Sequence, residues 1–271
     1  MDKEAYFISK FNDQQIGDDG AVLDGLVYSK DLFCEDIHFK RSWMRLEQIA
    51  KKSMLVNISD AIAMNATPLY ALIGIVIPKH FSHKDLEALA LGFNEAANAF
   101  DLRIIGGDTT SGKSLMISVT IISKSKKPLY RSGIKKGELL AYTGKIGESK
   151  KGLKTLLRGG KLGANSRFIT PQLRQNFIKE AANYINHGLD ISDGLSKDLS
   201  RLCAKKVGVQ FTQKLSKNEL CSGEEYEMLF SFDKRHKHKI ASIAKKHRVK
   251  LNIFGYTCTG KYQCRCHENH F

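Results

Sequence analysis

Long hydrophobic runs are missing from this sequence of 271 residues. A helix that crosses a membrane needs about 20 consecutive apolar residues, and no stretch of the chain approaches that length. The first residues, Met1-Asp2-Lys3-Glu4, are polar and charged and do not contain the apolar segment of a secretory signal. We therefore expect a cytoplasmic protein without a membrane partner.

Cysteine pairs of the type C-x2-C are missing as well. Four of the six cysteines, Cys34, Cys203, Cys221 and Cys258, are scattered, and a disulfide framework is not expected in a chain of this size that lacks a secretory signal. Near the C-terminus, Cys264, Cys266 and His267 form a C-x-C-H sequence, which lacks the C-x2-C pairs of common zinc sites. We interpret this region as a loose tail, with a metal site as the alternative.

Acidic residues are outnumbered, since 43 lysines and arginines against 28 aspartates and glutamates give a net charge of +15. Such a charge indicates an anionic partner, either a phosphorylated small molecule or a nucleic acid, unless it only reflects a lysine-rich composition. The lysines are spread along the chain, and no basic motif with interleaved aromatic residues accompanies them. No nucleic-acid partner is therefore expected, and a non-enzymatic nucleic-acid-binding protein remains the alternative from a different class.

Strand-like and helix-like hydrophobic patterns alternate along the chain, which predicts a mixed α/β fold. Apolar or β-branched runs predict strands at 26–29, 69–77, 102–105, 115–123, 138–143, 226–232 and 249–256. Apolar residues at helical spacing predict helices around 46–57, 86–100, 173–185, 195–203 and 240–244. A polar, basic stretch at 123–128 interrupts the pattern, so we expect an N-terminal mixed-sheet domain over 1–133 and a C-terminal α/β domain over 134–271.

Residues 107–114 fit the pattern G-x4-G-K-S of a phosphate-binding loop. Such a loop binds phosphate only when a helix follows it, because the helix N-terminus and the backbone amides then face the phosphates. Residues 115–123 are instead β-branched and alternating, which predicts a strand. We therefore reject the phosphate loop, expect a hairpin turn through 111–113, and keep Asp108 as a candidate site residue.

Aspartates beside glycine or serine recur at five places, each at the end of a predicted strand or helix. They lie in the segments 17–20, 29–31, 57–60, 106–109 and 190–194. Any one of them could be an ordinary turn or a helix cap. Together they predict a site for Mg²⁺, which prefers hard oxygen ligands and usually binds a few carboxylates together with substrate phosphates.

These motifs, in this order, resemble the thiamine-monophosphate kinases of the aminoimidazole ribonucleotide synthetase-like superfamily. The resemblance covers nearly the whole chain and rests on GDDGAVL at 17–23, SKD at 29–31 followed by His38-Phe39, NISDAIAMNATP at 57–68, IIGGDTT at 104–110, RSGIKKGE at 131–138, DISDGLSKDL at 190–199 and SGEEYEMLF at 222–230. It implies the two-domain architecture of that superfamily, a homodimer, and ATP-dependent phosphorylation of thiamine monophosphate to thiamine diphosphate with several Mg²⁺ ions. A sister enzyme that acts on another phosphate or small-molecule acceptor is the alternative.

The resemblance also implies roles for individual residues. The implied metal ligands are Asp19, Ser29, Lys30, Asp31, Asp60, Asp108, Asp190 and Asp193. The implied nucleotide contacts are Gly107, Asp108, Arg131 and Ser192, and the implied acceptor contacts are His38, Glu224 and Glu268. Because the acceptor is an ionised phosphate, direct in-line transfer is expected, with no catalytic base or nucleophile.

The chain departs from the family pattern at three positions. Lys30 stands where the family usually has the threonine of S-T-D, so one ion is lost or Lys30 takes its place if that hydroxyl binds metal. Asn65 replaces a glycine, which a turn tolerates because asparagine adopts left-handed backbone angles more readily than most residues. Glu268 stands where family members have an aromatic residue near the thiamine, so that stacking group is missing here.

Overall fold

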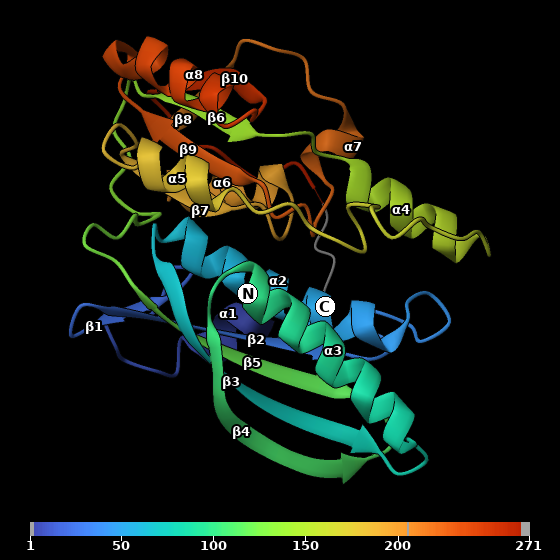
Figure 1. The fold of residues 1–271 in the computed structure, drawn as a ribbon. Coiled ribbons are helices and arrows are strands. Elements are labelled where there is room, and N and C mark those ends of the chain that lie inside the picture. Colours follow the sequence, from blue (N-terminus) through green and yellow to red (C-terminus); the bar gives the residue numbers. More distant parts are fainter. Residues whose placement is uncertain (1–2, 205, 267–271) are drawn as a thin grey trace.

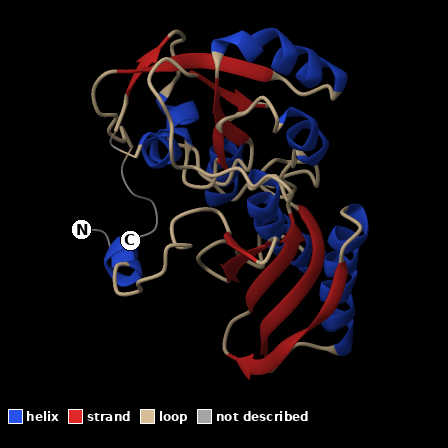
Figure 2. Cartoon of the chain, turned by 90° about the vertical axis from the view of Figure 1, so that its left-hand side faces the viewer, coloured by secondary structure: helices blue, strands red, loops and turns tan. Residues whose placement is uncertain are grey.

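The computed structural model describes residues 3–204 and 206–266, which form two five-stranded sheets with helices packed against them (Figure 1). Figure 2 shows the two sheets one above the other, and the short helix α1 (Lys3–Ile8) apart from both. The expected mixed α/β fold is confirmed. Among the described residues, no helix is both long enough and apolar enough to cross a membrane.

The first sheet is mixed and has the strand order β1-β2-β5-β3-β4. Its strands are β1 (Ala21–Leu23), β2 (Leu26–Cys34), β3 (Thr67–Pro78), β4 (Arg103–Gly112) and β5 (Met116–Lys124). Only β3 and β4 run parallel, which the helix between them in the chain makes possible. Helices α2 (Leu46–Ala63) and α3 (His83–Ala99) cover one face, where Ile117, Val119 and Ile121 of β5 are buried at every second position.

Helix α2 is enclosed on most sides, so polar residues such as Lys52, Asn57 and Ser59 are buried together with its apolar ones. Of its 18 residues, 13 are buried. It packs against α3 and the first sheet, and also against β7 (His187–Asp190) and α5 (Gln175–Ala181) of the second half. Gly92 of α3 permits the close approach of the two helices, since a Cβ there would lie 2.1 Å from the Glu47 carbonyl oxygen. Helix α2 can therefore present side chains to both halves of the chain.

The second sheet has the order β7-β9-β6-β10-β8, and all neighbouring strands run antiparallel. Its other strands are β6 (Leu139–Thr143), β8 (Gly208–Phe211), β9 (Met228–Phe232) and β10 (Leu251–Cys258). The remaining helices are α4 (Glu148–Leu157), α6 (Leu195–Cys203), α7 (Lys217–Leu220) and α8 (Lys237–Lys246), the last preceded by a 3-10 turn at Lys234–His236. All five residues of β9 are buried, Ser231 included, and the strand lies within the predicted range 226–232.

One hydrophobic core extends through both halves. It joins Phe33 and Ile58 of the first half to Phe177, Phe230 and Ile240 of the second. The linking segment 125–138 contains neither helix nor strand. The expected division at 133/134 falls within this segment and remains a prediction, because the shared core crosses it.

Two local expectations concern the turn after β4. The rejection of the phosphate loop is confirmed, because the strand β5 follows residues 107–114 and no helix does. The hairpin through 111–113 is wrong, because β3 lies between β4 and β5 in the sheet. The turn therefore connects two strands that do not pair with each other.

The expected absence of disulfides is also wrong, because Cys221 and Cys266 form one. The chain returns after β10 to the end of α7, where the Cα atoms of the two cysteines lie 5.6 Å apart. Tyr262 N donates to the Val207 carbonyl at 2.9 Å, and Arg265 N donates to Ser196 Oγ at 2.8 Å. Residues up to 266 are thus fixed against the second half and do not form a loose tail.

Candidate active site

Three carboxylates meet where the two halves of the chain join. Asp19 lies in the loop before β1, Asp60 in the last turn of α2, and Asp190 at the end of β7. One carboxylate oxygen from each lies within 4.8 Å of the other two. The structure thus brings together three of the aspartates that the sequence predicted as metal ligands, from three separate elements.

Neighbouring groups hold these three carboxylates in place. Ser59 donates its hydroxyl to Asp190 Oδ2 at 2.6 Å. The guanidinium of Arg131 pairs with Asp19 Oδ1, and the Arg131 backbone N donates to Asp18 Oδ1 at 2.6 Å. Asp19 Oδ2 is buried and has no hydrogen-bond partner among the described residues. One acceptor of the cluster is therefore left for a group from outside the protein.

Burial raises the pKa values of these carboxyl groups. It raises the pKa of Asp19 to about 7 against the opposing charge of Arg131, and that of Asp190 to about 7 against the hydrogen bond from Ser59. The pKa of Asp60 lies well above its ordinary value, first because of burial and then because of the charges of Asp31 and Asp190. Carboxylates in such a setting ionise together only when a cation compensates their charge.

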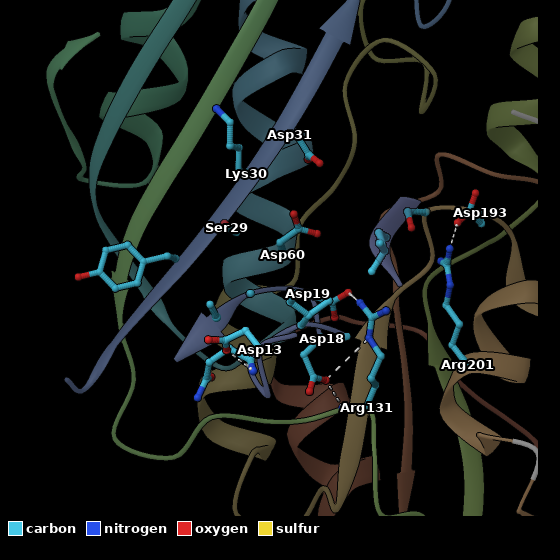
Figure 3. Close-up of a pocket in the computed structure, with 18 of the residues that line it drawn as sticks. Asp13, Asp18, Asp19, Ser29, Lys30, Asp31, Asp60, Arg131, Asp193 and Arg201 are labelled. Atoms are coloured by element: carbon cyan, nitrogen blue, oxygen red, sulfur yellow. Dashed lines mark hydrogen bonds and ion pairs between the residues drawn. The ribbon is translucent and has the colours of Figure 1, made fainter. Parts of the chain in front are cut away.

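A cavity of about 1050 Å³ opens beside the cluster (Figure 3). Its charged and hydroxyl-bearing walls include Asp18, Asp19, Ser29, Lys30, Asp31, Asp60, Arg131, Ser192, Asp193, Lys197 and Arg201. Burial also raises the pKa of Asp31, to about 6. The cavity therefore places carboxylates from the first half opposite cationic side chains, an arrangement suited to a metal-bound polyphosphate.

The three residues 29–31 on β2 point to alternate faces of the sheet. Ser29 is buried, and Asp31 and Ser29 face α2. Lys30 points to the opposite face, where its ammonium donates to Ser118 Oγ at 2.5 Å and to Thr120 Oγ1 at 3.4 Å. Figure 3 shows the Lys30 side chain turned away from Asp31. The ammonium of Lys30 therefore lies outside the carboxylate cluster.

Asp193 lies two residues before α6 and forms ion pairs that the sequence did not predict. Its carboxylate lies 2.5 Å from the Arg201 guanidinium and 3.8 Å from the Lys197 ammonium. Asp198 accepts from the Asp193 backbone N at 3.1 Å and from Arg201 at 2.8 Å, and burial raises its pKa to about 7. Two of these pairs had a clue in the sequence, because Lys197 follows Asp193 by four residues and Arg201 follows Asp198 by three.

The predicted acceptor residues His38 and Glu224 lie in one neighbourhood around Phe33. The His38 ring stacks on Phe33 with centroids 5.5 Å apart, and its Nδ1 accepts from the Cys34 backbone N at 3.0 Å. Glu224 accepts from Lys52 Nζ at 2.7 Å, and this ammonium lies 5.7 Å from the Phe33 ring centre. Sequence reasoning missed Lys52, which occupies a buried position on α2.

Other predicted residues lie elsewhere or outside the described chain. Gly107 and Asp108 lie on β4, the outermost strand of the first sheet, and do not line the cavity. Glycine at 107 has a steric cause, because a Cβ there would lie 1.8 Å from the Ile73 carbonyl oxygen. Glu268 and His267 fall outside the described residues.

Two sheets that share a core, with a carboxylate cluster where they meet, define a protein of the aminoimidazole ribonucleotide synthetase class. Residues 17–124 match the family model "AIR synthase related protein, N-terminal domain". A thiamine-monophosphate kinase of Nitrosopumilus maritimus is 32% identical over 238 residues, which cover 80% of this chain and 77% of that one. Another, from Pyrococcus horikoshii, is 30% identical over 257 residues, with 84% and 80% covered. The chain belongs to the thiamine-monophosphate kinase family.

Solved structures have the same fold. The thiamine-monophosphate kinase of Stenotrophomonas maltophilia K279a superposes with a TM-score of 0.80 at 26% identity, over 91% of this chain and 88% of that one. The structure described as AaThiL complexed with AMPPCP and TMP gives a TM-score of 0.83 at 24% identity, over 96% and 90%. The fold and the family that the sequence motifs predicted are confirmed.

Proposed function

We propose that this protein transfers the terminal phosphoryl group of ATP to thiamine monophosphate and so forms thiamine diphosphate. The observation that carries this proposal is the cluster of the half-buried Asp19 and Asp60 with the buried Asp190, beside a cavity with cationic side chains, in a chain of the thiamine-monophosphate kinase family. The relative of the same fold that is complexed with AMPPCP and TMP supports it. A cytoplasmic location, where ATP is plentiful, is part of the proposal.

The carboxylate cluster fits Mg²⁺. Its donors are oxygens, which Mg²⁺ prefers, and Asp19 Oδ2 is buried without a protein partner. Asp19, Asp60 and Asp190 would hold the ion, with Asp31 beside them at the cavity wall. When bound, Mg²⁺ supplies positive charge that neutralises the phosphates between which the phosphoryl group moves. Ser29, Asp108 and Asp193 remain predicted ligands of further ions.

The protein's own residues would position the two substrates. Arg131 and Ser192 line the cavity and would contact the nucleotide. Lys197 and Arg201 add positive charge at the same wall, which attracts an anionic nucleotide. The acceptor phosphate is already ionised, so no side chain has to remove a proton. Catalysis by this chain would then consist of holding the reacting oxygens in line and excluding water.

Product formation by the purified protein tests the proposal. With ATP, Mg²⁺ and thiamine monophosphate, thiamine diphosphate should accumulate, as measured by chromatography of the fluorescent thiochrome derivatives. Asp60→Asn should lower the rate about 100-fold or more, because a metal ligand is lost, while the circular dichroism spectrum stays that of the wild type. If thiamine monophosphate yields no diphosphate, the acceptor is wrong; other phosphorylated vitamins in the same assay then test a sister activity.

A homodimer through the open face of the first sheet is the second part of the proposal. Strand β4 is an edge strand, and nine of its ten residues are exposed. Leu32, Leu72 and Met116 are 54%, 37% and 38% exposed on the face that α2 and α3 leave uncovered. Long free edges and apolar patches of this kind are usually covered by another chain. Asp108 lies on this same face, so a second copy is the simplest route by which it could reach a metal or a nucleotide.

A further inference from the structure

Lys52 is a lysine in the interior of the protein. Its side chain is fully buried, and its ammonium donates to Glu224 Oε2 at 2.7 Å. The ammonium also lies 4.0 Å from the centre of the Phe168 ring and 5.7 Å from that of Phe33. Burying such an ion pair rarely stabilises a protein more than well-packed apolar side chains of the same volume would. A role in function is therefore the better explanation for the charge at this position.

The partner of Lys52 is held by a loop in unusual backbone geometry. Glu224 and Tyr226 both have left-handed backbone angles, with φ of 55° and 52°, which cost energy in residues other than glycine. The Glu224 backbone N donates to the Ser192 carbonyl at 2.7 Å, and Tyr226 N donates to the Ile191 carbonyl at 2.9 Å. The loop is thus fixed on the turn that carries Asp190 and lines the nucleotide cavity. Backbone strain is retained where the surrounding structure needs a particular side-chain direction.

The two oxygens of the Glu224 carboxylate are in different situations. Oε2 binds the Lys52 ammonium, whereas Oε1 has no hydrogen bond to any residue that the structure describes. The Glu224 side chain is 22% exposed, so it can meet a ligand, whereas Lys52 behind it cannot. Lys52 therefore fixes Oε2 from the protein interior, and Oε1 is available to a ligand.

The pair lies at one end of a line of residues that starts at the carboxylate cluster. Lys52 precedes Asp60 by eight residues on α2, a rise of about 12 Å along the helix. Tyr226, two residues after Glu224, donates its backbone N to the carbonyl of Ile191, the residue that follows Asp190, so the loop of Glu224 is tied to the chain beside the cluster. Thiamine monophosphate is an elongated molecule with a phosphate at one end and a permanently cationic thiazolium ring in the middle. With its phosphate near the metal ligands, its cationic part would extend toward Glu224.

We propose that Lys52 is a positioning residue for the acceptor: its ammonium fixes Oε2 of Glu224, so that Oε1 faces the cationic part of thiamine monophosphate. Lys52 itself does not touch the substrate, because Glu224, Phe33 and Phe168 enclose it. The inference rests on the proposed function and names the group that sets its acceptor specificity. Under this proposal, thiamine is recognised by Glu224, which belongs to the described part of the chain.

Steady-state kinetics of Lys52→Met test this role. Without the ammonium, Glu224 can turn toward solvent, so the KM for thiamine monophosphate should rise about tenfold or more, while the KM for ATP stays within about twofold. Lys52→Arg keeps the charge and should retain part of the acceptor affinity. An unchanged KM for thiamine monophosphate in Lys52→Met, or an equal rise in both KM values, would overturn the inference.

Lys51→Met is the matched control. Lys51 is the neighbouring residue on α2, but its ammonium pairs with Glu95 at 3.0 Å on the surface, with 34% and 46% of the two side chains exposed. Its removal should leave both KM values unchanged, because an exposed ion pair contributes little. A rise in the KM for thiamine monophosphate in this variant as large as in Lys52→Met would show a nonspecific effect and overturn the inference.

The double variant Lys52→Met/Glu224→Gln covers the case in which Lys52→Met does not fold. It removes both charges, so no buried ion is left without a partner. Its KM for thiamine monophosphate should equal that of Glu224→Gln alone, because Lys52 acts only through Glu224; a further rise would contradict this. If the wild type forms no thiamine diphosphate, the proposed function fails together with this inference. If the wild type is active and Lys52→Met behaves like Lys51→Met, only the inference fails.

Discussion

Lys30 shows how the geometry of a β-strand decides the role of a single residue. In the sequence, Lys30 stands among predicted metal ligands, where the family usually has the hydroxyl of a threonine. Successive side chains of a strand point to opposite faces, so Lys30 faces Ser118 and Thr120 while Asp31 faces α2. A threonine side chain at position 30 would point the same way. The lysine therefore takes no side-chain oxygen away from the cluster of Asp19, Asp60 and Asp190.

The raised pKa values of the cluster predict how stability depends on pH. Folding raises the pKa of Asp19 and of Asp190 from 3.8 to about 7, so the folded state binds these protons more tightly than the unfolded state does. The metal-free protein should then be most stable near pH 4 and should lose stability up to about pH 7. Asp60→Asn removes one of the repelling charges and should lessen this loss. Urea unfolding in EDTA at a series of pH values measures it.

Added Mg²⁺ is the control for this prediction. At about pH 8 it should raise the free energy of unfolding of the wild type, because it compensates charges that no proton then neutralises. Near pH 5 protons compete with the ion, and the increase should be smaller. A wild-type stability in EDTA that does not change between these pH values would contradict the proposed mutual repulsion of the carboxylates.

The sequence predicted the acids of the site better than the residues that surround them. Asp19, Asp60 and Asp190 stand within two residues of glycine or serine, near the ends of elements, a local pattern that can be read directly. The importance of Lys52 and Asp198 depends instead on burial, which only the folded chain determines. Lys52 is the second of two adjacent lysines, and nothing local distinguishes it from the exposed Lys51.

At the scale of elements, strands β3 and β4 approach each other so closely at Gly107 that a side chain there would collide with the backbone of β3. Gly106 and Gly107 have φ angles of 152° and 154°, and a Cβ at 107 would lie 1.8 Å from the Ile73 carbonyl oxygen. At Gly106 the nearest atom to such a Cβ would be a Leu72 methyl at 3.7 Å. The two adjacent glycines therefore share a backbone conformation but differ in the space around them.

This difference predicts unequal effects of two alanine substitutions. Gly107→Ala should destabilise the protein by more than about 3 kcal/mol, because backbone atoms of β3 would have to move. Gly106→Ala, with a similar φ but only an ordinary van der Waals contact to the Leu72 methyl, should cost about 1 kcal/mol. Urea unfolding of the two variants measures the difference. Equal losses of stability would show that conformation alone, rather than contact with Ile73, requires the glycines.

Most strands and helices could be predicted because their hydrophobic periods are local properties of the chain. The run 69–77 is continuous and apolar, and it became the central part of β3. The hairpin through 111–113 failed because strand order is set by pairings between distant segments, and β3 occupies the place beside β5 that β4 would need. Short elements such as β7 and β8 have four residues each, too few for a period to show.

At the scale of the whole molecule, the open face of the first sheet predicts that Asp108 acts in the site of a second copy. Asp108 and the cluster of Asp19, Asp60 and Asp190 lie on different faces of this sheet. Asp60→Asn and Asp108→Asn should each be inactive alone. A refolded mixture of the two should recover about one quarter of the wild-type activity, because half of the dimers would contain one intact site.

A second mixture is the control for this complementation. Asp60→Asn and Asp190→Asn alter the same cluster within one chain, so their mixed dimers contain no intact site and should stay inactive. Size-exclusion chromatography of the wild type should give the mass of two chains. An active monomer would contradict the prediction that a second copy contributes Asp108 to the site. A mixture of Asp60→Asn and Asp108→Asn without activity would contradict it as well.

The enclosure of α2 has a consequence for synthesis on the ribosome. One side of this helix packs on the first sheet, but its other side is covered by α5 and β7, which end at Ala181 and Asp190. The nascent chain therefore exposes an apolar helix surface until roughly 130 further residues have been added. The first half cannot complete its packing before then, so chaperones that bind apolar surfaces have their longest opportunity during this interval.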